Sequence, residues 1–259
     1  MRMMKKVLGT VTVLALSVSL LAGCGSTAAS PVSSAASTAA ESTTSSVVSE
    51  ATSAAADENA AAAAQLLNDL TGSYQELWPV ILADEYKQTW LDVCTALVGE
   101  DNAEAAFEKL SSMVTGDVYG EDAVEAYANG GGAYFCGFTN SLATLTFDGE
   151  TSTISGTDKD GNVLFSHTYH YIGMEPVHGL YEFESDDADS GEFTYFFLAP
   201  DTSAETYHIE FRYGSDADAL SQYDAGDYAY WLASGISTDC DQTMIDNCIE
   251  LFCTENLAG

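Results

Sequence analysis

The sequence predicts an α+β domain with helices first, a meander of antiparallel strands next and one closing helix. Apolar residues recur at helical spacing between 60 and 127, and they do so again near the C-terminus. Between these regions, from Gly130 onward, short extended runs alternate with turn residues. Antiparallel strands at such short intervals are typical of a barrel or a sandwich.

Residues 1–23 have the layout of a secretory signal peptide. A positive start is followed by an apolar segment over 7–20, which is shorter than the ~20 residues that span a bilayer. The next residues, Leu-Ala-Gly-Cys at 21–24, resemble a bacterial lipobox, whose cysteine carries an acyl chain such as palmitate. The alternative is a short membrane anchor with an incidental cysteine. We expect a lipoprotein held by Cys24 at the extracellular face of the cell membrane.

Residues 24–62 are predicted to be a flexible linker. They are mostly Ser, Ala, Thr, Val and Glu, and they cannot bury enough apolar surface to offset the entropy lost on ordering. All 3 tryptophans and all 14 tyrosines lie beyond the linker. Residues 63–259 are therefore predicted to form one domain with a core of its own.

The chain is strongly acidic, with 7 Lys and Arg against 40 Asp and Glu and a net charge of -33. Such a surface repels nucleic acid and anionic lipid. We therefore expect no nucleic-acid partner, and attachment to the membrane through the lipid on Cys24. The charge by itself indicates a soluble extracellular domain and is not specific for a metal.

Helices are predicted over most of 60–127. The first, over 60–79, carries an apolar stripe that is interrupted by Gly72. The second, over 84–99, ends at Gly99, a typical C-cap residue. The helical spacing continues over 102–114 and 121–129.

Seven extended runs follow, and Asp-Gly pairs at 148–149 and 160–161 favour hairpins between them. The runs are 133–138, 142–147, 152–157, 163–173, 179–185, 192–199 and 206–214. After an acidic loop and an aromatic cluster at 227–232, a last helix is predicted, with Ser237 or Thr238 as its N-cap.

Five cysteines remain besides Cys24, and none forms a Cys-x-x-Cys motif. Cys240 and Cys248 on one helix would be separated by ~12 Å of rise, which is beyond disulfide reach. A bridge from the last helix must therefore lead to Cys94 or Cys136. The odd number leaves at least one free thiol, and buried free cysteines are ordinary core residues.

Several short motifs occur in an order known from one family. They are Gly72-x-Tyr74 with Pro79, Gly137-Phe138-Thr139, Tyr169-x-Tyr171-x-Gly173, the run 179–184, and the stretch 193–216. Together, over roughly 66–256, they resemble the ZinT (YodA-like) family of extracytoplasmic zinc-binding proteins. The resemblance implies a calycin (lipocalin-like) antiparallel β-barrel with N-terminal helices and a closing C-terminal helix.

The resemblance also implies a zinc site, because in that family three histidines from adjacent strands converge inside the barrel mouth. Matched position by position, they fall on Phe196, Thr206 and His208, so only His208 keeps an imidazole. One interpretation is a relocated site in which His170 faces the barrel beside His208. A carboxylate completes this site, since Glu205, Glu210 and Asp201 supply oxygen near the turn. The other is that His208 is a satisfied polar residue at the barrel mouth.

The function implied by the resemblance is the capture of zinc outside the membrane for a metal-uptake ABC transporter. Catalysis is not predicted, because the chain has no nucleophile elbow, no phosphate loop and no His-Glu-x-x-His. Two alternatives remain open. One is a calycin-fold module that has lost zinc and binds a small apolar ligand beside Phe196, and the other is a non-catalytic surface display protein. Polar groups that converge on His208 would favour metal binding. An apolar cavity in the barrel would favour a small ligand, and a solid core without a cavity would favour the display protein.

Overall fold

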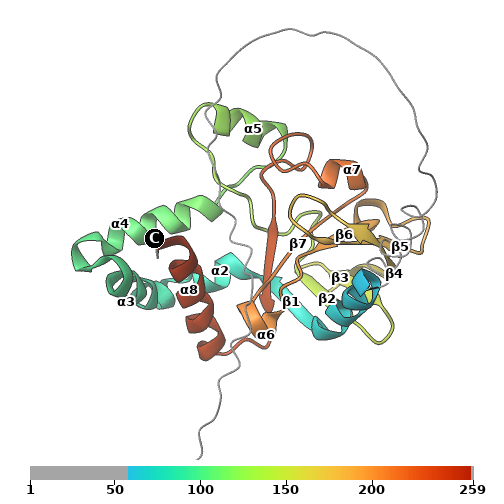
Figure 1. Cartoon of the computed structure of the whole chain (residues 1–259), viewed down its shortest axis with the longest axis horizontal. Coiled ribbons are helices and arrows are strands. Elements are labelled where there is room, and N and C mark those ends of the chain that lie inside the picture. The colour runs from blue at the N-terminus through green and yellow to red at the C-terminus, as the bar shows by residue number, and fades with distance from the viewer. Residues whose placement is uncertain (1–57, 258–259) are drawn as a thin grey trace, which may run out of the picture. The chain divides into compact units, whose positions relative to one another are not determined.

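The computed structural model describes residues 58–257 (Figure 1). The predicted signal peptide, the predicted lipidation site Cys24 and nearly all of the predicted linker lie outside these residues. Residues 58–69 are helical, including the last part of the predicted linker. Within 58–257, no helix combines the length and the apolarity needed to cross a bilayer.

Eight antiparallel strands form a closed barrel, in which each strand pairs with its neighbours in sequence and the last pairs with the first. They are β1 (Gly72–Glu76), β2 (Thr144–Asp148), β3 (Thr153–Thr157), β4 (Val163–Met174), β5 (Tyr181–Ser185), β6 (Tyr195–Leu198), β7 (Ile209–Gly214) and β8 (Ala233–Ser237). Helices precede and follow the strands, so the predicted α+β, calycin-like barrel is confirmed. Pairing of β1 with β8 decides between the barrel and the sandwich.

Two strands of the barrel were not expected from the sequence. β1 lies within the segment predicted as the first helix, which stops before Gly72, where φ is +148°. Hydrogen bonding to β2 and β8 on either side then holds β1 extended. β8 lies between the aromatic cluster and the last helix, whereas the run 133–138 forms only isolated bridges at Phe135.

Aromatic side chains fill the barrel interior. Side chains alternate across the wall, so Phe196 on β6 and its partner Tyr213 on β7 both point inward, and both are 0 % exposed. The ring of Phe196 lies 5.3 Å from that of Tyr213 and 5.4 Å from that of Tyr169. Small barrels are commonly filled in this way by their own side chains. The interior is therefore a packed core.

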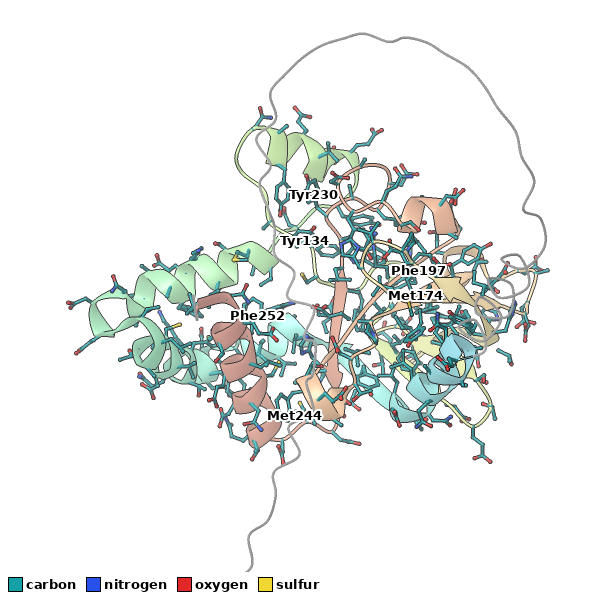
Figure 2. The ribbon with its side chains drawn as sticks, viewed as in Figure 1. Tyr134, Met174, Phe197, Tyr230, Met244 and Phe252 are labelled. Atoms are coloured by element: carbon teal, nitrogen blue, oxygen red, sulfur yellow. The ribbon has the colours of Figure 1, made fainter. Side chains whose placement is uncertain are left out.

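A second core lies among the helices beside the barrel, at the left of Figure 1. It is built by α2 (Leu77–Ile81), α3 (Lys87–Val98), α4 (Glu100–Val114) and α8 (Gln242–Leu257). Phe252, labelled in Figure 2, lies 4.8 Å from Trp78 between ring centroids, and Trp90 Nε1 donates to the Ile81 carbonyl at 2.8 Å. The shorter elements are η1 (Asp84–Tyr86), α5 (Glu121–Ala128), η2 (Gly191–Phe193), α6 (Ser203–Thr206) and α7 (Ala217–Leu220).

The helix ends show one confirmed prediction and one correction. Gly99 follows α3 with φ of 86°, and its amide donates to the Thr95 carbonyl, as expected of a C-cap. The predicted caps Ser237 and Thr238 of the last helix were wrong. α8 begins at Gln242, and Asp241 Oδ1 accepts the amide of Met244 at 2.9 Å.

Replacing Asp241 with alanine is expected to lower the free energy of unfolding by about 1 kcal/mol, because the first turn of α8 loses its acceptor. Urea unfolding followed by circular dichroism measures this change. Asp239→Ala is the matched control, since Asp239 is also an exposed aspartate just before α8. Equal losses in both variants would show that the cap contributes nothing.

The five cysteines within 58–257 are all free thiols. Cys240 precedes α8 instead of lying on it, which corrects the expected position. Cys94, Cys136, Cys248 and Cys253 are buried in the helical core.

Candidate functional site

His208 lies on the outer face of the barrel, just before β7. Along β7 the residues Ile209, Phe211 and Tyr213 belong to the interior core, so Glu210 points outward. The His208 side chain is 18 % exposed, and its Nδ1 lies 3.9 Å from Cys248 Sγ on α8. His208 therefore lies between the barrel wall and α8. The expectation that its side chain lies inside the barrel mouth was wrong.

The backbone before β7 holds the imidazole in one orientation. Tyr207 has φ of 65°, which turns the chain sharply and allows His208 Nδ1 to donate to the Thr206 carbonyl at 2.7 Å. The other ring nitrogen, Nε2, faces Glu210 Oε1 at 3.8 Å. The two nitrogens of the ring thus serve different partners, and Nε2 is the one directed at a carboxylate.

The surroundings of His208 favour positive charge. Burial alone would lower the pKa of His208, but the hydrogen bonds and charges of Cys248 and Glu210 outweigh it and raise this pKa well above its usual value. An imidazolium in this place is stabilised by the same negative potential that would attract any other cation.

Two further carboxylates lie close enough to act on His208 and Glu210. Asp201 follows β6, and Glu255 lies in the last turns of α8. Partial desolvation and then the charge of Glu210 raise the pKa of Asp201, while His208 lowers it. Desolvation also raises the pKa of Glu255, followed by a lowering effect of His208 and raising effects of Glu210 and Asp201. Together, His208, Glu210, Asp201 and Glu255 form the His208 cluster.

The sequence named Asp201 and Glu210 as oxygen donors near the turn, but it missed Glu255. A usable signal existed, because Glu255 follows Cys248 by two helical turns and so shares its face of α8. That face was interpreted as core, since Cys248 and Ile249 are apolar. The end of the same face reaches the solvent, where a carboxylate is acceptable.

Within residues 58–257 the His208 cluster is not assembled as a metal site. Zinc in proteins takes three or four nitrogen, sulfur or oxygen ligands. Among residues 58–257, no three His, Cys, Asp or Glu side chains are grouped closely enough to hold a metal ion. The physical reason lies in the ring of His208, since Cys248 is near Nδ1 and Glu210 near Nε2, and one ion cannot reach both sides.

The other two positions that the family resemblance matched to ligands do not converge on His208. Phe196 points into the barrel, on the opposite side of the wall. The Thr206 hydroxyl is hydrogen-bonded to the carbonyls of Thr202, at 3.1 Å, and His208, at 3.0 Å. The residues of the matched triad are thus separated by the barrel wall or already paired.

The structure does not bring His170 to His208. The side chain of His170 points outward from β4 and is 52 % exposed. Its Nδ1 lies 2.7 Å from Asp186 Oδ1. In the strand register, His170 aligns through Glu184 and Tyr195 with Gly214, six residues beyond His208. Six residues of strand span about 20 Å. The relocated site that pairs the two histidines is therefore not assembled.

It is His167, and not His170, that points to the inner side of β4. Its ring stacks on that of Phe165 with centroids 5.9 Å apart, and its Nδ1 lies 2.8 Å from Asp187 Oδ2. The fourth histidine, His178, packs on the ring of Tyr223 at 3.7 Å. Neither of them contributes to the His208 cluster.

A half-open hollow of about 270 Å³ lies outside the barrel, beside α5. Small residues and backbone line it, among them Gly116, Ala126, Gly131 and Gly132. Within the described chain, no three His, Cys, Asp or Glu side chains are grouped there to hold a metal ion. The hollow is separate from the barrel interior, where the apolar-ligand alternative would require its cavity.

No protein-family model matches the chain, and no curated protein matches it. Among solved structures, the Zn(II)-bound ZinT-like domain of Streptococcus pneumoniae AdcA is similar with a TM-score of 0.45 and 15 % identity, over 71 % of this chain and 89 % of that one. Zn(II)-bound AdcA from Streptococcus pneumoniae is similar with a TM-score of 0.44 and 14 % identity, over 71 % of this chain and 35 % of that one. Similarity at this level carries no inference about a binding site.

Proposed function

We propose that the chain is a lipid-anchored extracytoplasmic protein that binds a divalent metal ion, zinc, at the His208 cluster and handles it for uptake. The observation that carries the proposal is the pairing of His208 Nε2 with Glu210 Oε1 at 3.8 Å, with Asp201 and Glu255 close enough for their pKa values to respond to both residues. The lipobox at 21–24 supports the location, and the sequence resemblance to the ZinT family supports zinc as the metal. In this role the domain is a binding protein without catalytic activity, and its partners are the membrane, through Cys24, and a metal-uptake ABC transporter.

The electrostatics of the His208 cluster suit a cation that enters and leaves. Besides burial, the charge of Glu210 raises the pKa of Asp201, and the charges of Glu210 and Asp201 raise that of Glu255. These carboxylates therefore repel one another, and a divalent ion placed among them offsets that repulsion. The hydrogen bond from His208 Nδ1 to a backbone carbonyl is the arrangement that commonly orients a metal-binding histidine. Two donors, His208 Nε2 and Glu210 Oε1, face each other at 3.8 Å, and Asp201 and Glu255 can supply further oxygen atoms. We therefore expect weaker binding than at a complete three-histidine site.

Titration of the full chain in detergent with Zn²⁺ at pH 7, followed by calorimetry, tests the proposal. We expect one saturable site that is lost in His208→Ala and weakened at least about 10-fold in Glu210→Gln. His170→Ala is the matched control, because His170 is also surrounded by carboxylates on the outside of the barrel but lies in another part of it. This variant should bind like the wild type.

Weak binding at many sites that is unchanged by His208→Ala would contradict the proposal, because only the acidic surface would then be titrated.

The packed aromatic interior favours the display protein as the second candidate function, since a solid barrel holds no small ligand. That function predicts no saturable site in the same titration.

A further inference from the structure

The helices α3 and α8 each place one cysteine in the seam between them. Cys94 lies on α3 and Cys253 on α8, and both are 0 % exposed within the same apolar cluster. Neither thiol belongs to the His208 cluster, so the chemistry of this pair is independent of the proposed metal site.

Two side-chain contacts join the helices across the seam. Thr89 Oγ1 donates to Asp246 Oδ1 at 3.4 Å. The ring of Trp90, the next residue of α3, meets that of Phe252 edge to face with centroids 6.0 Å apart. The first two turns of α3 therefore pack directly against the middle of α8.

Each cysteine lies within about one turn of these contacts and is buried in the same cluster. Cys94 follows Trp90 by four residues, and Cys253 follows Asp246 by seven. At these spacings each cysteine lies on the same side of its helix as the earlier residue, which points into the seam. Burial raises the pKa of both thiols, and each thiol is also close enough to act on the pKa of the other. The remaining thiols have other surroundings: Cys136 lies near Trp78, and Cys248 contacts His208.

We propose that Cys94 and Cys253 form a disulfide bond that joins α8 to α3 when the chain folds in an oxidising environment. Each thiol gives up its hydrogen and one sulfur–sulfur bond forms. The two electrons and two protons pass to a disulfide oxidant, which is thereby reduced to two thiols. Since neither sulfur is accessible in the folded domain, exchange takes place while α8 is still undocked.

Refolding of the reduced full chain in oxidised and reduced glutathione tests the proposal. Free thiols are then blocked under denaturing conditions, and the digested chain is analysed by mass spectrometry. We expect the peptides of Cys94 and Cys253 to be linked, with the mass of two hydrogen atoms missing, and Cys136, Cys240 and Cys248 to carry the blocking group. Blocked Cys94 and Cys253, or a bridge between any other pair, would overturn the proposal.

A second measurement uses the thermal unfolding midpoint before and after reduction. Reduction should lower the midpoint of the wild type by several degrees, because the unfolded chain is no longer cross-linked. Reduction should leave the midpoint of Cys94→Ala unchanged, whereas the matched control Cys240→Ala should respond like the wild type. Should Cys94→Ala fail to fold, the peptide map of the wild type decides alone. A wild-type midpoint that is insensitive to reduction would also contradict the bridge.

Discussion

Replacing Phe196 with alanine is expected to lower the free energy of unfolding by about 3–5 kcal/mol, the range for a large aromatic removed from a core. Phe196 is 0 % exposed at the centre of the barrel, where its ring meets those of Phe165, Tyr169, Phe211 and Tyr213. The strands on either side are held by the closed hydrogen-bonding ring, so the wall cannot collapse fully into the space left.

Guanidinium unfolding followed by tryptophan fluorescence measures this loss. Val163→Ala is the control, since Val163 is 70 % exposed on β4 and its truncation should change the free energy of unfolding by less than about 0.5 kcal/mol. A loss below about 1 kcal/mol for Phe196→Ala would show that the barrel interior is loosely packed and able to collapse.

The variant Phe196→His separates the barrel core from the metal site. Were position 196 a lost ligand beside His208, a histidine there would increase zinc affinity. Since Phe196 faces the interior and His208 the exterior, we expect reduced stability and unchanged affinity. An increase in affinity above the wild type in calorimetry would contradict the outward placement of His208.

Replacing Arg212 with alanine is expected to cost about 3–5 kcal/mol, because several buried carbonyls lose a charged donor at once. Arg212 is 0 % exposed on the outer side of β7, and its guanidinium donates to the carbonyls of Leu220, Gln222 and Tyr228. Within the described chain no carboxylate forms a salt bridge with it, and the ring of Tyr223 lies 4.3 Å below it. Burial lowers the pKa of Arg212, so the charge is costly to hold there, and the three carbonyls accept its hydrogen bonds in place of water.

Guanidinium unfolding and hydrogen exchange over 215–230 measure the effect, since Arg212 ties this segment to the barrel. Arg212→Lys should lose part of the stability, because lysine keeps the charge and cannot match the fork of three carbonyls. Lys159→Ala is the control for loss of a cation, with Lys159 81 % exposed on a turn. If Arg212→Ala were as stable as that control, the guanidinium would not organise the segment.

Local patterns in the sequence were sufficient for most helices and strands. Gly99 ended its helix as expected, and strands appeared on both sides of the Asp-Gly turns at 148–149 and 160–161. These features are decided over a few neighbouring residues by backbone conformation and side-chain period, so they can be predicted without knowledge of the fold. β1 and β8 could not be predicted in this way, since five-residue strands next to helices owe their extended form to pairing with partners far along the chain.

The candidate site depended on tertiary structure to a greater degree. The sequence identified His208 as the histidine to examine, and it named Asp201 and Glu210 as carboxylates near it. The sequence could not show on which side of the barrel wall His208 lies. A shift of one residue moves every side chain of a strand to the other face, and the turn at Tyr207 fixes which residues of β7 point inward. Glu255 and Cys248 come to His208 only through the docking of α8.

Short-range periodicity and composition were thus enough to predict most helices, most strands, the closing helix and the acidic character of the chain. Three further features follow from the tertiary structure: the sheet closes between β1 and β8, Phe196 belongs to the core, and His208 faces α8. Closure and facing are set by contacts between residues distant in the chain, and no local pattern carries that information.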